Sequence, residues 1–178
     1  MSFPLKIKKN KNLRKVLEIN PSTYKNKQGV IFSLLDPKIS NKILPLGNKF
    51  KHIKITKRKK NSLVGIHHDN KTWKLFGCIN GSIFHNVSCL DKKDKQYLKT
   101  TNFILSEKKI RFILIPPSYG NSFYCLTNAT IVYCLSYRGG YNDIEKQQTI
   151  LWNDKSLSIK WPCNKPDLTV RDKKGLNL

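Results

Sequence analysis

The chain has 178 residues, 39% of them hydrophobic, and a mean hydropathy of −0.47. These values predict one domain over residues 1–178 with a sizeable core, and they exclude membrane-spanning helices, since no apolar run approaches the roughly 20 residues that cross a bilayer. The basic N-terminus, residues 1–15, lacks the apolar stretch of a secretory signal, so we expect a cytoplasmic protein with no membrane partner.

The formal net charge is +23, but only five of the 34 cationic residues are arginine. Nucleic-acid-binding proteins usually recruit arginine for bidentate contacts, whereas the lysines here are spread along a chain that is also rich in asparagine and isoleucine. We therefore interpret the charge as a compositional bias and expect no specific nucleic-acid partner. The densest cluster, residues 57–60, is interpreted as a solvated turn, with a phosphate-facing role as the alternative.

Short strands separated by turn residues dominate the rest of the sequence. They are expected over residues 30–34, 50–55, 63–66, 74–79, 83–90, 102–105, 111–115, 122–126, 130–136 and 157–161. Asn80-Gly81 is a strong signal for a two-residue hairpin. Helical signal is confined to 36–43 and 144–148. The first forty residues are less strand-rich, and about 25 of them are expected to contact a partner subunit. Regularly spaced short strands predict an all-β sandwich or barrel with minor short helices.

The five cysteines form an odd set without a Cys-x-x-Cys pair. We interpret them as small buried thiols in a reducing compartment. Metal ligands are equally scattered, because the adjacent His67 and His68 point to opposite faces of a strand and His85 lies on another strand. No glutamate follows at a useful spacing. We therefore expect neither a metal nor another cofactor.

The segment from Gly65 to Leu75 carries the residues best suited to chemistry. Side chains alternate along a strand, so if Ile66 packs outward then His67 faces the interior, and Lys74 opens the next strand. Inward-facing His and Lys side chains require a polar cavity, because burying an unsatisfied polar group is costly. A satisfied structural histidine is the alternative unless partner groups converge on it.

Suitable partners occur elsewhere in the sequence. Proton transfer needs a base, a group that orients it, an acid and a charge stabiliser. His67 suits the base, Lys74 suits a stabiliser of an oxyanion, and Tyr133, within an apolar strand, suits the acid. Asp172 suits the orienting group if the chain end folds back onto the body.

The C-terminal segment contains a pattern that would deliver Asp172. Leu157, Ile159 and Trp161 alternate as in a short strand, which Pro162 ends because it lacks the N–H that a ladder needs. Asp172 then follows among cationic residues, where a carboxylate is either solvated or folded back onto another part of the protein. In the second arrangement, Leu157, Ile159 and Trp161 would dock the tail on the sheet, and Asp172 could serve His67.

With these residues the sequence resembles the dTDP-4-keto-6-deoxyhexose 3,5-epimerases, which are cupin-fold sugar-nucleotide epimerases. It resembles more closely their relatives that act on GDP-4-keto-6-deoxyheptoses in capsule and surface-polysaccharide pathways. The similar stretches, between about residue 20 and residue 175, include Gly65-Ile66-His67, Lys71-Thr72, Lys74-Leu75, Ile115-Pro116-Pro117, Gly120-Asn121-Ser122, Tyr133, Gly140-Tyr141, Trp152-Asn153-Asp154, Trp161-Pro162 and Arg171-Asp172.

The resemblance implies a cupin-type double-stranded β-helix, or jelly roll, that forms a homodimer without metal. It implies an isomerase that epimerises carbon 3, carbon 5 or both of a nucleotide-linked 4-keto-6-deoxy sugar. By resemblance, His67 is the base and Asp172 its dyad partner, Lys74 stabilises the enolate, and Tyr133 returns a proton from the opposite face. The substrate-binding residues that it implies are His52, Lys54, Asn121, Tyr141 and Gly29.

Two positions depart from the family. Val64 and Gln28 stand where arginine is usual, and those arginines are associated with the pyrophosphate and active-site region. Lysines at positions 27, 57, 59 and 60 are candidates to replace them, although an ammonium group is a point charge and not a fork. The alternative function is therefore a catalytically altered cupin that binds a nucleotide sugar or carbohydrate without turnover.

Overall fold

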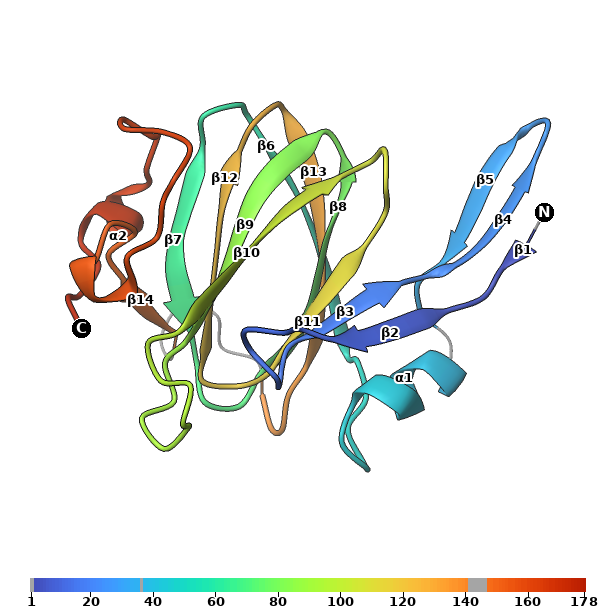
Figure 1. Cartoon of the computed structure of the whole chain (residues 1–178), viewed down its shortest axis with the longest axis horizontal. Helices are drawn as coiled ribbons and strands as arrows, with labels where there is room; N and C mark the ends of the chain where they lie inside the picture. Colours follow the sequence, from blue (N-terminus) through green and yellow to red (C-terminus); the bar gives the residue numbers. More distant parts are fainter. Residues whose placement is uncertain (1, 36, 141–146) are drawn as a thin grey trace.

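In the computed structural model, which describes residues 2–35, 37–140 and 147–178, two antiparallel β-sheets face each other (Figure 1). The six-stranded sheet has the order β2-β3-β11-β8-β13-β6, and the five-stranded sheet has the order β10-β9-β12-β7-β14. A third sheet, β1-β4-β5, extends from the body as an arm. Two short α-helices and one 3₁₀ turn complete the described elements, so the prediction of an all-β fold with minor helices is confirmed.

The elements have the following bounds. The strands are β1 (Ser2–Phe3), β2 (Lys6–Lys9), β3 (Leu17–Asn20), β4 (Ser22–Asn26), β5 (Gly29–Ser33), β6 (His52–Arg58), β7 (Leu63–His68), β8 (Trp73–Asn80), β9 (Ser82–Cys89), β10 (Thr100–Ser106), β11 (Phe112–Ile115), β12 (Tyr119–Cys125), β13 (Ala129–Ser136) and β14 (Gln148–Ile150). The helices are α1 (Pro37–Ile43), η1 (Lys155–Leu157) and α2 (Val170–Lys173). None of the helices in the described ranges is long and apolar enough to cross a membrane.

Apolar side chains from both sheets form the main core, because alternate residues of each strand point inward. They include Phe76, Cys78, Ile83, Val87, Phe103, Ile113, Ile115, Phe123 and Ile131. The outer face of the six-stranded sheet is covered as well, since Ile39 and Ile43 of α1 belong to one cluster with Leu75 and Leu114. Four of the five cysteines are buried free thiols, and Cys163 is half-buried, so the interpretation of most of them as buried thiols is confirmed.

The turn at Asn80-Gly81 differs from the predicted hairpin. It joins β8 to β9, but these strands belong to different sheets, so the turn crosses from one layer to the other. Gly81 has φ +76°, and a Cβ at this position would collide with the backbone oxygen of Asn128, so glycine is required there. The local turn signal was correct, but it does not determine which strands pair.

The N-terminal forty residues are richer in strands than the sequence indicated. Strands β2 to β5 all fall there, and β2 and β5 are exposed along their whole length. The apolar run of β5 was predicted as a strand at 30–34, whereas β2 and β4 carry few apolar residues and were missed. The strand β3 was missed as well, although its Leu17 and Ile19 alternate and pack in the cluster of Ile39 and Ile43. Apolar side chains of the arm and of β6 are exposed, and Ile31 and Ile55 each retain 64% of their accessible surface.

The strand predicted over residues 157–161 is wrong. This segment instead holds the end of η1, which Asp154 caps, followed by Ser158 in the left-handed region at φ 48°. The edge of the five-stranded sheet is taken by β14, which pairs with β7. The apolar residues of the segment still dock, since Leu157 is buried beside Ile66 and Ile150. The helix predicted at 144–148 lies largely outside the described residues, and its last residue, Gln148, begins β14.

Candidate active site

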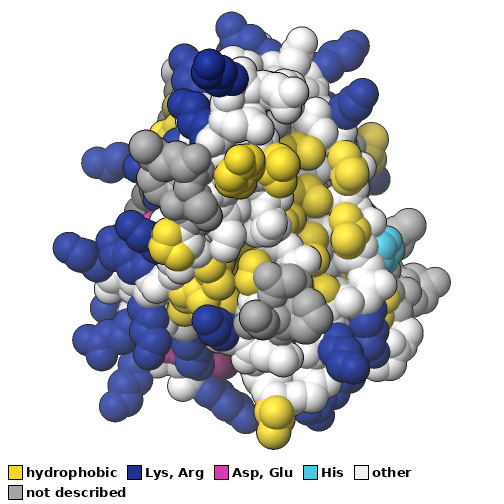
Figure 2. All heavy atoms as spheres, turned by 90° about the vertical axis from the view of Figure 1, so that its right-hand side faces the viewer, with side chains coloured by type: hydrophobic (Ala, Val, Ile, Leu, Met, Phe, Trp, Pro, Cys, Tyr) yellow, Lys and Arg dark blue, Asp and Glu magenta, His cyan; other side chains and the backbone are white. Residues whose placement is uncertain are grey.

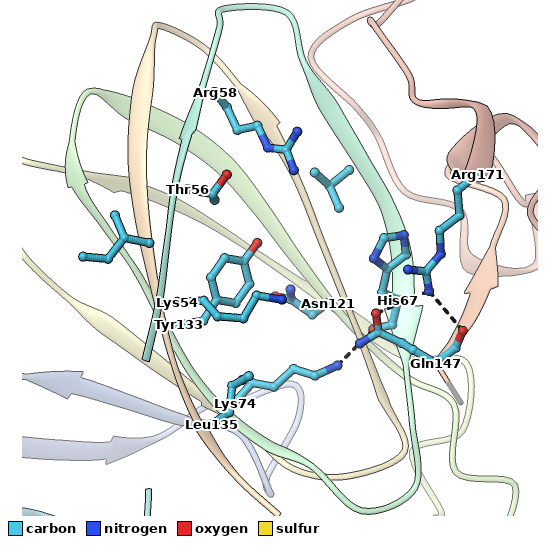
Figure 3. A pocket seen from close by; sticks show the side chains of 12 residues that line it. Lys54, Thr56, Arg58, His67, Lys74, Asn121, Tyr133, Leu135, Gln147 and Arg171 are labelled. Atoms are coloured by element: carbon cyan, nitrogen blue, oxygen red, sulfur yellow. Dashed lines mark hydrogen bonds between the residues drawn. The ribbon is translucent and has the colours of Figure 1, made fainter. Parts of the chain in front are cut away.

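A cavity of about 370 Å³ opens between the two sheets (Figure 3). The six-stranded sheet contributes polar side chains from β6, β8 and β13, and the five-stranded sheet contributes residues of β7 and β12. The lining residues that carry polar side chains are Lys54, Thr56, Arg58, His67, Lys74, Asn121, Tyr133, Gln147 and Arg171. Each predicted catalytic group except Asp172 lines this cavity, and Asp172 lies directly behind His67.

His67 and Asp172 form a buried hydrogen-bonded pair. The distance between His67 Nε2 and Asp172 Oδ1 is 2.7 Å, and Asp172 is only 1% exposed. Thr169 caps α2 and donates from its Oγ1 to the other carboxylate oxygen of Asp172, at 2.7 Å. A Cβ at position 65 would lie 2.8 Å from Asp172 Oδ1, so the glycine there makes room for the carboxylate. The prediction that the chain end folds back to His67 is confirmed in its geometry.

The electrostatics of the pair leave His67 neutral and Asp172 charged. Burial lowers the pKa of His67 below its ordinary 6.5, and this effect outweighs the opposing hydrogen bond to Asp172. Burial acts to raise the pKa of Asp172, but the hydrogen bonds from His67 and Thr169 bring it below 3.8. Since a carboxylate only accepts hydrogen bonds, Nε2 of His67 carries the proton, and Nδ1 holds the lone pair of a base.

Lys74 supplies positive charge next to this base. Its side chain is buried, and Nζ lies 3.5 Å from Asp69 Oδ2 and 3.4 Å from the backbone oxygen of His67. Backbone N–H groups of Lys71 and Thr72 donate to Asp69 and fix it. Burial acts to raise the pKa of Asp69, but Lys74 and these N–H groups lower it. The ammonium group is thereby held where it can stabilise a negative oxygen.

Tyr133 comes from the six-stranded sheet, which faces the sheet that carries His67. It lies on β13, where it pairs with Lys54 of β6 and packs edge-on against Phe76 at 5.0 Å between ring centroids. Figure 3 shows Tyr133, Lys54, Lys74 and Asn121 converging on one space with His67. A phenol and an imidazole therefore reach the same cavity from different sheets.

Asn121 lies beside His67 in the five-stranded sheet. The two residues pair across β12 and β7, and Asn121 is almost fully buried while still lining the cavity. His85 Nε2 lies 2.8 Å from its Oδ1. His68 points the other way, as predicted, and lines a second cavity with Asp69, Asn70 and Ser118.

Two predicted substrate contacts do not line the described cavity, and a third lies outside the described residues. His52 begins β6 on the same side as Lys54, but it does not touch the described cavity wall. Gly29 begins β5 on the arm, away from the two facing sheets (Figure 1). Tyr141 lies outside the described residues.

Three polar lining residues were not predicted from the sequence: Thr56, Gln147 and Arg171. Arg58 lies in the cluster at 57–60, for which a phosphate-facing role was the alternative to a solvated turn. The predicted strand ended at residue 55, whereas β6 runs to Arg58, so alternation from Lys54 would have placed Thr56 and Arg58 on the cavity side. Arg171 was assigned no role beyond its place in the Arg171-Asp172 stretch that resembles the family. Its Nε donates to Thr149 Oγ1 at 2.9 Å, and its Nη2 donates to the backbone oxygen of Gln147 at 3.0 Å.

Within the described ranges, no group of three or more His, Cys, Asp or Glu side chains is arranged to hold a metal ion. A neutral imidazole backed by a carboxylate, a phenol and a buried ammonium are the groups needed to remove and return a proton next to a carbonyl.

Comparisons with known proteins agree with this geometry. A family model described as dTDP-4-dehydrorhamnose 3,5-epimerase matches residues 10–178. A dTDP-4-dehydrorhamnose 3,5-epimerase of Salmonella typhimurium is 25% identical over 162 residues, which are 88% of this chain and 87% of that protein. One of Shigella flexneri is 24% identical over 163 residues, which are 90% of this chain and 89% of that protein.

Solved structures show the same fold. The dTDP-6-deoxy-D-glucose-3,5-epimerase RmlC of Legionella pneumophila, in complex with dTDP-4-keto-L-rhamnose, has a TM-score of 0.89 at 21% identity and covers 97% of this chain and 92% of its own. The 4-keto-6-deoxy sugar epimerase NovW of Streptomyces spheroides has a TM-score of 0.87 at 21% identity and covers 98% and 88%. Together with the match of the family model over nearly the whole sequence, this places the chain in the dTDP-4-dehydrorhamnose 3,5-epimerase family.

Proposed function

We propose that this chain epimerises carbon 3, carbon 5 or both of a nucleotide-linked 4-keto-6-deoxy sugar. The observation that carries the proposal is the His67–Asp172 pair, at 2.7 Å, in a cavity that Lys74 and Tyr133 also line. Inversion next to a ketone needs a base on one face of the carbon and an acid on the other. His67 and Tyr133 belong to sheets that face each other, so the base and the acid would approach the carbon from opposite sides.

In the proposed reaction, Nδ1 of His67 takes the proton from the carbon next to the C4 ketone, and the C–H electron pair moves to form an enolate. Lys74 stabilises the negative charge that develops on the ketone oxygen, and Asp172 stabilises the imidazolium. The phenol of Tyr133 then gives its proton to the opposite face of the carbon, and the carbonyl re-forms. Transfer of the proton from His67 to the tyrosinate through solvent restores the enzyme.

We propose that Arg58 and Arg171 provide part of the grip on the diphosphate that the arginines usual at positions 28 and 64 would give. Both line the cavity, together with Lys54. A guanidinium group can bind phosphate oxygens through two parallel hydrogen bonds. Val64 also lines the cavity, so the family's usual arginine is replaced by an apolar wall at that position.

The proposed assembly is a homodimer of single-domain subunits in the cytoplasm. Figure 2 shows apolar side chains gathered on the face that carries the arm, with Lys and Arg around them. Exposed apolar residues of β4, β5 and β6 include Tyr24, Ile31, Phe32, Ile53 and Ile55. Such a patch fits a second copy of the chain, with about the first 25 residues at the contact. Gly29 and His52 would then reach substrate only within the assembled dimer. The buried free thiols fit a reducing compartment.

The test is solvent exchange. The protein is incubated in deuterated water with dTDP- and GDP-linked 4-keto-6-deoxy sugars, both hexoses and heptoses, and deuterium at carbons 3 and 5 is followed by NMR. We expect exchange with at least one of them, and faster exchange with a GDP-linked heptose would support the closer relationship to the heptose enzymes. Saturable binding without exchange would favour the alternative, a cupin that binds nucleotide sugar without turnover, which the absence of arginine at positions 28 and 64 motivates.

A further inference from the structure

His85 is a fully buried histidine that the proposed proton transfers do not use. It lies on β9, between Phe103 of β10 and Phe123 of β12 in the sheet register. Its ring stacks on Phe76 at 4.2 Å between centroids and 20° between planes. The ring has few polar contacts. Nε2 of His85 lies next to Oδ1 of Asn121, and Nδ1 has no hydrogen-bond partner among the described residues.

The surroundings of His85 keep it neutral. Burial lowers its pKa to about 3, because a charged imidazolium among aromatic rings would lose its hydration without an anion to compensate. A neutral imidazole has one N–H donor and one lone pair. The two nitrogens of His85 therefore have different roles, and the hydrogen bond to Asn121 decides which nitrogen carries the proton.

The proton belongs on Nε2. An amide oxygen can only accept, so the 2.8 Å contact between His85 Nε2 and Asn121 Oδ1 requires an N–H on Nε2. The lone pair on Nδ1 then stays unpaired among the rings. In the reverse arrangement, with the amide turned over, Nδ1 would carry a buried N–H without an acceptor, and orphaned buried donors are rare in native structures.

With Oδ1 engaged by His85, the NH₂ group of Asn121 is left for the cavity. Asn121 lines the cavity and pairs with His67 across the strands, so these two donors lie near the proposed base. We propose that His85 is a positioning residue that fixes the amide of Asn121 so that its NH₂ group donates to an acceptor oxygen of the substrate, a carbonyl or hydroxyl next to the reacting carbon. The proposal rests on the proposed function of the cavity.

The arrangement gives the substrate a neutral donor in addition to the cationic ones. Lys54, Arg58, Lys74 and Arg171 already bring positive charge to the cavity wall. An ionisable group in place of Asn121 would itself gain or lose a proton as the pH changes. The amide of Asn121, held by a neutral histidine, instead keeps one orientation over the pH range in which the protein works.

A matched pair of variants tests the role. His85→Gln keeps an N–H donor where Nε2 stands, and His85→Met has a similar unbranched length without the donor. We expect His85→Gln to keep kcat/KM for exchange within about threefold of the wild type. We expect His85→Met to lose about tenfold or more, the scale of one hydrogen bond at about 1.4 kcal/mol.

Stability separates positioning from packing. Met suits an apolar site better than Gln, so His85→Met should unfold at the same temperature as His85→Gln or at a higher one. Lower activity in the more stable variant would be the signature of positioning. Equal or higher activity of His85→Met than of His85→Gln would overturn the proposal.

The tautomer of His85 is read directly on the free wild-type protein. In ¹⁵N-labelled protein, the two ring nitrogens have different chemical shifts according to which one carries the proton. We expect Nε2 to be protonated and the signals to be constant between pH 5 and pH 9. A proton on Nδ1, or titration within this range, would overturn the proposal. Because this readout needs no substrate, it stands apart from a failure of the proposed epimerase function.

Discussion

Replacing Asp172 with asparagine removes one charge from the buried pair while keeping the size of the side chain. In the native protein, Asp172 Oδ1 accepts from His67 at 2.7 Å, and Oδ2 accepts from Thr169 at 2.7 Å. The asparagine can still be held by both neighbours, so the fold should survive. The imidazolium that forms on proton abstraction, however, loses its charged partner.

The expected loss follows from the strength of that contact. Hydrogen bonds to charged groups contribute about 1.5–3 kcal/mol, which corresponds to a fall in kcat/KM of roughly 10- to 150-fold. An amide can also donate to Nε2 through its NH₂ group, which would move the ring proton to Nδ1 and remove the lone pair from the base. This wrong tautomer places the loss toward the upper end of the range or beyond it.

The assay is deuterium incorporation into the substrate, measured together with thermal unfolding. Asp154→Asn is the matched control, because Asp154 is another buried carboxylate of the C-terminal segment that accepts backbone N–H groups of Ser156 and Leu178. We expect Asp154→Asn to change stability but leave exchange within about twofold, a difference well under 1.4 kcal/mol. Wild-type exchange in Asp172→Asn, or an equal loss in both variants, would refute the reasoning.

Three further outcomes follow from the site. Tyr133→Phe should keep deuterium exchange but stop inversion of the carbon, and NMR of the product would detect both; full inversion would assign the acid elsewhere. Lys74→Met should lower exchange by about 10²- to 10³-fold, as loss of an oxyanion stabiliser does, while binding of the nucleotide diphosphate measured by calorimetry changes little; an unchanged exchange rate would contradict its role. Below pH 6.5 the unfolded chain protonates His85 while the folded protein does not until about pH 3, so stability should fall with decreasing pH by about 1.4 kcal/mol per unit from this group. In urea unfolding experiments, the free energy of unfolding of His85→Gln should depend less steeply on pH between pH 6 and pH 4 than that of the wild type. An unchanged pH dependence would show that His85 is not buried in the neutral form.

The fall in reaction rate at low pH depends on the protonation of His67. Its folded pKa lies below 6.5, so the base is neutral at pH 7, and activity should fall only as the pH drops through that lowered value. Asp172 contributes stability above its unfolded pKa, which is lost as the pH falls through its lowered folded pKa.

How far the sequence determined this picture depends on the kind of signal. Alternation along β7 correctly placed Ile66 outward and His67 inward, because side-chain direction along a strand is a local property. Resemblance to the family paired Asp172 with His67 across 105 positions of sequence, which no periodicity could have shown. The docking of Leu157 was also foreseen, although the segment is not a strand.

The errors arose where tertiary context decides. Asn80-Gly81 is a turn, but whether it closes a hairpin or links two layers depends on partners elsewhere in the chain. Among the arm strands, the apolar run of β5 was predicted at 30–34, whereas β4 has little hydrophobic pattern and was missed. His85 was weighed only as a metal ligand, since neither its burial nor its hydrogen bond to Asn121 is visible before the sheets are placed.

The central claim is that His67 removes a proton next to the ketone of a nucleotide-linked 4-keto-6-deoxy sugar. It is tested most directly by comparing deuterium incorporation at carbons 3 and 5 by the wild type and by His67→Asn, with folding of both verified by unfolding curves. We predict incorporation by the wild type and none above background by His67→Asn. Incorporation at the wild-type rate by His67→Asn would contradict the account.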